Sequence, residues 1–266
     1  MNADHCVLTI LTTTFNRAHT LRRLFQSLQD QTDRSFEWTV IDDGSTDGTQ
    51  DLLFELKRLK MLPVHVFCQE NSGKHAAINV GVRAARGEWI FIVDSDDALS
   101  SDAVATVLQA CTNPLSRTGF CFRRGYFHGD IIGRSLESNV KVCLHPTEAS
   151  RIFRGDLAYV FRREVMLRHP FPVIPGERFI PELYIWNRIG DEGEIIFFPG
   201  KIIYLCEYLP DGYTANFAAN LRRNPQGFLL FYATQLHRER RWLDKAKCFV
   251  RCLQCLARLA VRGVVA

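Results

Sequence analysis

Four short polar segments contain the side chains of this sequence that could do chemistry. Each follows an apolar stretch, and they are residues 12–17 (TTTFNR), 42–48 (DDGSTDG), 69–75 (QENSGKH) and 94–97 (DSDD). Carboxylates in such segments can bind a hard divalent cation, which keeps water ligands that a phosphate can displace. A diphosphate leaving group needs a counter-charge of this kind when its bond breaks. The four segments therefore indicate a site for a phosphorylated ligand.

The fourth segment holds two carboxylates at the spacing of a metal site. Asp94 and Asp96 stand two residues apart in an expected turn, where they could bind a hard divalent cation. The alternative is an acidic turn that only begins the next helix, with Asp97 or Ser100 as its N-cap. Because three further polar segments are expected at the same edge, the metal-binding interpretation is favoured.

The second and third segments offer groups for a nucleotide. Asp42 or Asp43 could accept hydrogen bonds from a base or ribose, although Asp43-Gly44 and Asp47-Gly48 could simply be turn residues. Both interpretations can hold, because Asp42 and Asp43 are expected to point to different faces. Lys74 could contact a phosphate, but the segment is not a P-loop, because Cys68 and His75 replace the glycine and hydroxyl residue of that motif. No Gly-x-Gly-x-x-Gly follows the first apolar stretch, which disfavours a dinucleotide cofactor.

Glu182 follows Pro181 at the expected start of a helix. The helix dipole favours a carboxylate there, so an ionised Glu182 could act as a general base. The alternative is a helix-start residue that takes no part in chemistry.

The first hundred residues alternate between expected strands and helices, which indicates a parallel sheet covered by helices. In such sheets ligands bind beyond the carboxyl ends of the strands, where all four polar segments fall. The expected strands are 7–11, 36–41, 64–68 and 89–93, and the expected helices include 21–28, 52–59 and 76–85.

The pattern weakens after residue 111. Residues 111–144 look like irregular strands and loops, and 170–181 like a proline-rich loop. The remaining expected elements are strands at 157–161, 195–198 and 202–205, a helix at 183–189, and one or two helices at 228–260.

Composition and charge limit the classes of protein. The chain has 266 residues, 47% of them hydrophobic, with 33 basic and 29 acidic residues, which is typical of a globular protein. We see neither a membrane-spanning stretch nor a signal peptide, and nine scattered cysteines argue for a reducing cytoplasm. Cys248, Cys252 and Cys255 have a spacing close to an iron–sulfur motif, but a packed stripe on a helix is favoured.

The net charge of +4 is unevenly distributed. Residues 237–262 contain eight basic and two acidic residues, so the positive charge belongs to the C-terminal segment. A nucleic-acid-binding protein would be expected to spread basic residues over a docking face, and nucleic acid is therefore excluded as a partner.

In order along the chain, these motifs resemble family 2 glycosyltransferases of the GT-A fold, which are inverting enzymes that use nucleotide-diphosphate sugars. The resemblance is dense over residues 5–110 and looser over 178–182 and 207–214. It also includes the third expected helix, through Asn71, Ser72, Gly73, Ala76, Asn79, Gly81, Ala84 and Gly87.

The resemblance implies a role for each matching residue. Glu182 would deprotonate the acceptor hydroxyl, and Asp96 would bind Mn²⁺ or Mg²⁺ on the diphosphate. Because the sequence has no histidine between Glu182 and His237, the coordination of the metal would be completed by water, Glu207 or Asp211. The nucleotide, expected to be uridine, and the rest of the donor would contact Thr12, Thr14, Asn16, Arg17, Asp42, Asp43, Lys74, Asp94 and Ser95.

The resemblance also implies an α/β GT-A fold and a carbohydrate acceptor. Residues 1–220 would form the catalytic domain, with a nucleotide-sugar half (1–110) and an acceptor half (111–220), and 221–266 a basic amphipathic helical extension. The enzyme would transfer a hexosyl or N-acetylhexosaminyl group in the synthesis of a surface polysaccharide such as O-antigen or capsule. Its acceptor is expected to be a carbohydrate, which in this family is often linked to undecaprenol.

Three questions stay open from the sequence. Residues 237–262 could lie on the inner face of the plasma membrane, pack on the catalytic domain, or form a homodimer. A sugar-nucleotide nucleotidyltransferase would need a glycine-rich basic loop after the first strand, which residues 12–17 do not provide. A non-catalytic nucleotide-sugar-binding module would leave Glu182 far from any donor.

Overall fold

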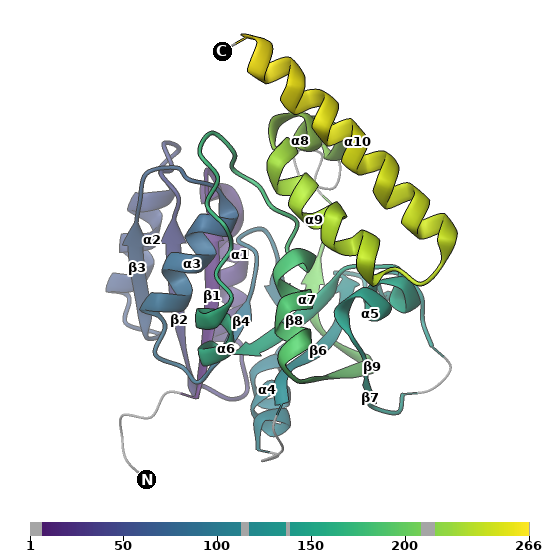
Figure 1. The fold of residues 1–266 in the computed structure, drawn as a ribbon. Helices are drawn as coiled ribbons and strands as arrows, with labels where there is room; N and C mark the ends of the chain where they lie inside the picture. Colours follow the sequence, from purple (N-terminus) through teal and green to yellow (C-terminus); the bar gives the residue numbers. More distant parts are fainter. Residues whose placement is uncertain (1–6, 113–116, 137–138, 209–215, 266) are drawn as a thin grey trace.

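The computed structural model describes residues 7–112, 117–136, 139–208 and 216–265. Within these ranges nine strands form one sheet in the order β3-β2-β1-β4-β8-β6-β9-β5, and β7 pairs with β9 (Figure 1). The strands are β1 (Leu8–Thr14), β2 (Phe36–Asp42), β3 (Val64–Cys68), β4 (Trp89–Ile92), β5 (Ala98–Leu99), β6 (Arg117–Tyr126), β7 (Val142–Cys143), β8 (Leu157–Arg162) and β9 (Glu194–Cys206).

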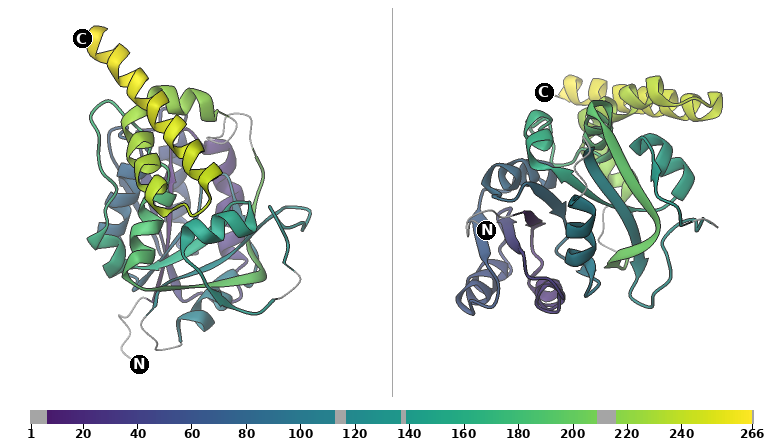
Figure 2. Two further views of the ribbon diagram at one scale, coloured as in Figure 1. Left: turned by 45° about the vertical axis from the view of Figure 1, so that its right-hand side comes forward. Right: turned by 90° about the horizontal axis from the view of Figure 1, so that it is seen from below.

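Helices cover both faces of this sheet (Figure 2). On one face α1, α2 and α4 pack over a core that includes Leu24, Trp38 and Val104, and on the other α3, α5, α6 and α7 pack around Leu11, Phe161 and Trp186. The helices are α1 (Ala18–Gln29), α2 (Thr49–Arg58), α3 (Lys74–Ala84), α4 (Ala103–Cys111), α5 (Pro146–Phe153), α6 (Arg163–Arg168), α7 (Leu183–Glu192), α8 (Phe217–Arg223), α9 (Pro225–Arg238) and α10 (Trp242–Val265).

The first half of the sheet is parallel, as the sequence predicts. β1 pairs in parallel with β2 and β4, and β2 with β3. β1, β2 and β4 are buried along their whole length, because helices cover both faces of these strands. Their carboxyl ends meet at one edge, which is where the polar segments follow.

The second half of the sheet is mixed. Residues 111–144 were expected to form irregular strands and loops, and they contain β6, a ten-residue strand between β8 and β9 whose bounds were not predicted. This strand is hard to recognise in the sequence because it contains arginines. Arg123 is nevertheless buried, and it donates to the backbone carbonyls of Ile132 and Arg134. The two strands expected at 195–198 and 202–205 are a single strand, β9, whose register against β6 shifts in the middle.

The C-terminal region forms two long helices, α9 and α10, with the short α8 beside them (Figure 1). Cys255 is fully buried against Leu221 and Phe228, so the cysteine stripe packs inside the helical cluster as predicted. Among the described helices none is both long and apolar enough to span a membrane. The predicted division at residue 220 stays a prediction, and α8 crosses it.

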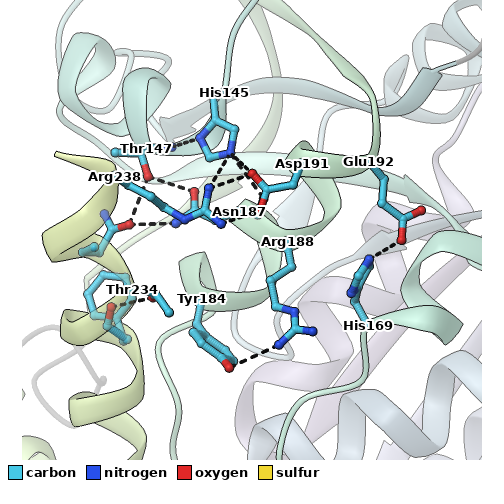
Figure 3. A network of polar contacts seen from close by, with 12 residues as sticks. His145, Thr147, His169, Tyr184, Asn187, Arg188, Asp191, Glu192, Thr234 and Arg238 are labelled. Carbon is cyan, nitrogen blue, oxygen red and sulfur yellow. Dashed lines mark hydrogen bonds and ion pairs between the residues drawn. The ribbon is translucent and has the colours of Figure 1, made fainter. Parts of the chain in front are cut away.

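A polar network ties α9 to α5 and α7 (Figure 3). Arg238 on α9 forms a two-pronged ion pair with Asp191 on α7, and His145 Nε2 lies 3.2 Å from Asp191 Oδ1. Deeper in the same interface, Thr147 Oγ1 donates to Asn187, and Asn187 Nδ2 donates to Gln235 at 2.8 Å. Since the same helix α7 begins beside Glu182, the network fixes the far end of the element that carries this residue.

We expect Asp191→Asn to lower the free energy of unfolding at pH 7 by about 1 kcal/mol, because it removes the charge that pairs with Arg238. The hydrogen bonds from Arg238 hold the pKa of Asp191 below its ordinary value of 3.8. The stabilising effect is therefore present above that value and disappears as the pH falls through the lowered pKa. Urea unfolding from pH 7 to pH 3 measures it, with the exposed Asp130→Asn as control, and an equal loss at both pH values would contradict it.

Candidate active site

A cavity of about 1480 Å³ opens at the carboxyl ends of β1 and β4. All four polar segments contribute to its wall, through residues 13–17, Asp43, Asn71, Gly73, Lys74 and residues 94–97. The opposite wall comes from part of residues 150–159, from the loop leading to Glu182, from α8 and from Arg262 near the end of α10. The sheet edge predicted to bind a ligand is thus one side of a partly open cavity.

The first segment divides into structural and accessible residues. Thr12 is fully buried, its hydroxyl accepts a bond from Trp38 Nε1 at 3.0 Å, and it does not line the cavity. Thr14 does line it, and its hydroxyl has no hydrogen-bond partner among the described residues. Asn16 adopts a left-handed backbone (φ 52°) and its side chain accepts from the Thr46 amide, which holds the loop beside the second segment.

Asp42 and Asp43 have different surroundings, as the sequence predicts. Asp42 lies outside the cavity wall and accepts hydrogen bonds from Ser45 and Gln50. Asp43 lines the cavity and accepts from the Gly73 amide at 2.8 Å and from Ser72. Asp43 therefore ties the loop after β3 to the end of β2, whereas Asp42 shapes its own turn.

At Gly73 the two walls of the cavity lie close together. Its φ of +92° suits glycine, and an added Cβ would lie 2.2 Å from the carbonyl oxygen of Arg178. The loop that leads to Glu182 therefore rests directly on the backbone that precedes Lys74.

Lys74 joins the two walls of the cavity by ion pairs. Its Nζ lies 2.6 Å from Asp94 Oδ1 and 2.7 Å from Glu182 Oε1. Burial by itself would lower the pKa of Lys74, but the two carboxylates outweigh it and raise that pKa well above its ordinary value. An ammonium group is therefore fixed between the acidic turn and the start of α7.

Asp94 has a lowered pKa, whereas the two carboxylates after it have raised pKa values. Burial would raise its pKa, but Lys74 and Arg124 outweigh burial and hold the pKa well below its ordinary value. Burial and the charge of Asp94 raise the pKa of Asp96, and those same two causes raise the pKa of Asp97 to about 7. Ser95 is buried between them and lines the cavity.

The helix-cap interpretation of this turn is wrong. Asp97 is buried and accepts a hydrogen bond from the Tyr204 hydroxyl at 2.8 Å, so its side chain faces the sheet. α4 begins after Asp102, whose carboxylate accepts from Ser100 Oγ, and neither Asp97 nor Ser100 caps it.

Arg124 pairs with the carboxylates of the acidic turn and was not predicted from the sequence. Its guanidinium lies 3.3 Å from Asp94 and 3.6 Å from Asp97, and it stacks 3.9 Å over the Tyr204 ring. Arg124 stands on β6, within the segment expected to be irregular. The alternation of Phe120 and Phe122 was the available signal, since it puts Arg124 on the same face of a strand.

The candidate metal ligands form an incomplete set. Among the described residues no group of three or more His, Cys, Asp or Glu side chains could hold a metal ion. Asp96 is nevertheless a carboxylate with a raised pKa, and Arg17 Nε lies 3.7 Å from its Oδ2 atom. Such a site fits Mg²⁺ or Mn²⁺ that takes most ligands from a diphosphate and water. Glu207 lines the cavity paired with Arg23, and Asp211 lies outside the described residues.

We expect Lys74→Met to lower the free energy of unfolding at pH 7 by about 2 kcal/mol, because it leaves Asp94 and Glu182 without their shared cation. The loss should shrink as the pH falls below the ordinary pKa of an aspartate, since protonation of Asp94 removes the unpaired charge. Chemical denaturation measures the difference, and Lys57→Met on the exposed side of α2 is the control. Equal stabilities of the Lys74→Met variant and the unaltered protein would contradict this charge balance.

The sequence matches the family model described as "Glycosyl transferase family 2" over residues 9–159. A GalNAc(5)-diNAcBac-PP-undecaprenol beta-1,3-glucosyltransferase of Campylobacter jejuni is 25% identical over 84% of this chain and 72% of its own length. An uncharacterized glycosyltransferase of Nostoc sp. is 32% identical over 76% of this chain, which spans 63% of that relative.

Solved structures share the fold. TarS 1–349 of S. aureus in complex with UDP-GlcNAc superposes with a TM-score of 0.66 at 19% identity, covering 95% of this chain and 72% of that one. The mannosyltransferase PcManGT from Pyrobaculum calidifontis, in complex with GDP-Man and Mn²⁺, gives 0.61 at 19% identity over 97% of this chain and 75% of its own. The α/β fold expected from the sequence is therefore confirmed.

Proposed function

Because the chain belongs to glycosyl transferase family 2, we propose that its cavity transfers a sugar from a nucleotide-diphospho-sugar to a carbohydrate acceptor, with Glu182 as general base. The observation that carries the proposal is the Lys74 bridge. It places Glu182 in the cavity wall, 2.7 Å from a cation that also touches the acidic turn. A non-catalytic binding module would not need a carboxylate at this point.

The donor would lie along the edge of the parallel strands. The unpartnered hydroxyl of Thr14, together with Asp43 and Asn71, would contact the nucleoside, for which we propose uridine, as in the TarS complex. Thr12 and Asp42 would not contact the donor directly, since neither lines the cavity. Asn16 and Arg17, from the loop after β1, and Asp94 and Ser95, from the acidic turn, would surround the ribose and diphosphate.

The chain would supply both a carboxylate to accept the proton and cations to stabilise the leaving diphosphate. Glu182 would accept the proton of the acceptor hydroxyl, whose oxygen would then attack the anomeric carbon from the face opposite the diphosphate. The bond between that carbon and the diphosphate oxygen would break, its electron pair would pass to the oxygen, and the configuration would invert. Lys74 and Arg17 stand at the acidic turn, where they would stabilise the negative charge of the leaving group.

A divalent cation would belong beside Asp96. The raised pKa of this carboxyl reflects burial next to Asp94, and a cation would offset that repulsion. When bound, Mg²⁺ or Mn²⁺ would neutralise the diphosphate as it leaves. The mannosyltransferase of the same fold was crystallised with Mn²⁺, which supports this class of ion.

We propose a lipid-linked oligosaccharide as the acceptor, in the synthesis of a bacterial surface polysaccharide. The support is the Campylobacter relative, whose substrate is carried on undecaprenyl diphosphate. The arginines of the far wall, Arg178 and Arg223, suit an anionic acceptor because both are exposed and line the cavity. An acceptor of this kind would keep the enzyme peripheral at the cytoplasmic face of the plasma membrane.

Glu182→Gln should lower kcat by about 10²- to 10⁴-fold, because the amide cannot take the proton from the acceptor hydroxyl. Donor binding should persist, since the amide oxygen can still accept a bond from Lys74. Transfer kinetics and calorimetric titration with UDP separate the two effects. Normal turnover would assign the base to another residue. Of the two alternatives that the sequence offers, Asp191 lies outside the cavity wall, which leaves Asp211.

Asp96→Ala should abolish the dependence of nucleotide binding on metal. Calorimetry with a panel of nucleoside diphosphates, each with and without Mn²⁺, measures this, with Asp102→Ala outside the cavity as the control. An unaltered response to Mn²⁺ in Asp96→Ala would remove this residue from the metal site. Failure of every nucleoside diphosphate to bind the unaltered protein would overturn the proposed function.

A further inference from the structure

Helix α10 packs with one side only. Cys248 and Cys255 are buried against the neighbouring helices, whereas the opposite side is open (Figure 1). We define the outer face of α10 as its large apolar residues that are at least 46% exposed, namely Trp242, Leu243, Phe249, Val250, Leu253, Leu256 and Val261. An exposed apolar surface of this extent marks a contact with a partner.

The outer face is continuous along the helix. Trp242, Phe249 and Leu256 recur every seven residues, and Leu253 stands between the last two, so they share one side of the helix. With 24 residues, α10 is about 36 Å long, and it lies along the outside of the molecule in all three views (Figures 1 and 2). A flat partner could therefore contact the whole face at once.

The charges beside the outer face have a single sign. Lys245, Lys247 and Arg258 are exposed along it, and the acidic residue of this helix, Asp244, is turned toward Arg241 and Lys247. By contrast, Arg262 is turned toward α8, where it donates to the backbone carbonyls of Arg222 and Arg223, and it also pairs with Glu177. The partner should therefore be both apolar and negatively charged.

These properties decide between a second copy of the chain and a lipid surface. If two outer faces packed together, the lysines and Arg258 of one copy would face those of the other, and like charges repel. Anionic lipid headgroups pair with the basic residues while the acyl region accepts the apolar ones. We propose that α10 docks the protein on an anionic membrane by its outer face.

Docking at α10 would also orient the cavity. Arg262, near the C-terminal end of the helix, lines the cavity together with Arg223 of α8. The cavity therefore opens beside the end of the docked helix, within reach of an acceptor anchored in the same membrane. This consequence rests on the proposed function, whereas the docking itself does not.

The chain contains its own reporter for a test. Of its four tryptophans, Trp38, Trp89 and Trp186 are buried, whereas Trp242 is 75% exposed at the start of the outer face. Vesicles of phosphatidylcholine with about 30% phosphatidylglycerol should shift the fluorescence to shorter wavelength and protect it from acrylamide. Phosphatidylcholine alone should give little change, and about 1 M salt should weaken the response. Trp242→Phe should lose the fluorescence signal but still float with the vesicles.

Matched variants test the two components separately. Leu253→Ser with Leu256→Ser should reduce flotation with anionic vesicles at least about tenfold, whereas Leu59→Ser with Met61→Ser, equally exposed but at the end of α2, should not. Reversing the flanking charges (Lys245→Glu, Lys247→Glu, Arg258→Glu) should reduce it at least about tenfold, and Lys57→Glu with Arg58→Glu should leave it unchanged. Circular dichroism confirms that each variant is folded.

Three results would overturn the proposal. The first is equal binding to neutral and anionic vesicles, and the second is binding that survives both sets of α10 changes. The third is a failure to bind any vesicle, combined with a dimer in sedimentation that dissociates in the variant Leu253→Ser with Leu256→Ser. The last result would assign the outer face to a second copy of the chain. Since neither donor nor acceptor is present in these measurements, none of the three bears on glycosyl transfer.

Discussion

The site depends on a balance of charge that no single element provides. Asp94, Asp96 and Asp97 crowd the end of β4, and Glu182 approaches from the start of α7. Carboxylates this close repel strongly in a partly buried environment unless cations stand between them. Lys74, at the first turn of α3, and Arg124, from the middle of the sheet, meet that need. The sheet matters to function chiefly because it brings these four elements to one point.

The parallel half of the fold could be predicted, and the contacts across the cavity could not. Strands buried on both faces leave continuous apolar runs, so the sequence located the edge where Asp43, Lys74 and Asp94 gather. The pairing of Lys74 with Glu182 spans more than a hundred residues and leaves no local pattern. β6 was missed because it contains arginines, whose side chains bond to backbone carbonyls. Thr12 was assigned to the nucleotide because the sequence does not show where β1 ends: the strand continues to Thr14, and only Thr13 and Thr14 at its end line the cavity.

The C-terminal helices show a similar division. Basic residues and apolar spacing predicted amphipathic helices, and the cysteine stripe predicted a packed side. The sequence could not tell which side is covered, because α10 is apolar on two opposite sides and the small residues, Cys248 and Cys255, occupy the buried one. The polar network around Asp191 and Arg238 then fixes where α9 lies, and α9 in turn selects the side of α10 that remains open.

Arg124 limits which segments could replace the second half of this chain. It comes from β6, outside residues 1–110, yet it pairs with Asp94 in the acidic turn that follows β4. A chimera that joined residues 1–110 to the second half of a distant relative would inherit the acidic turn without its matching cation, unless that relative supplied one. Such a chimera should therefore keep the charge balance of the site only where the replacement strand carries a cation at this place in the sheet.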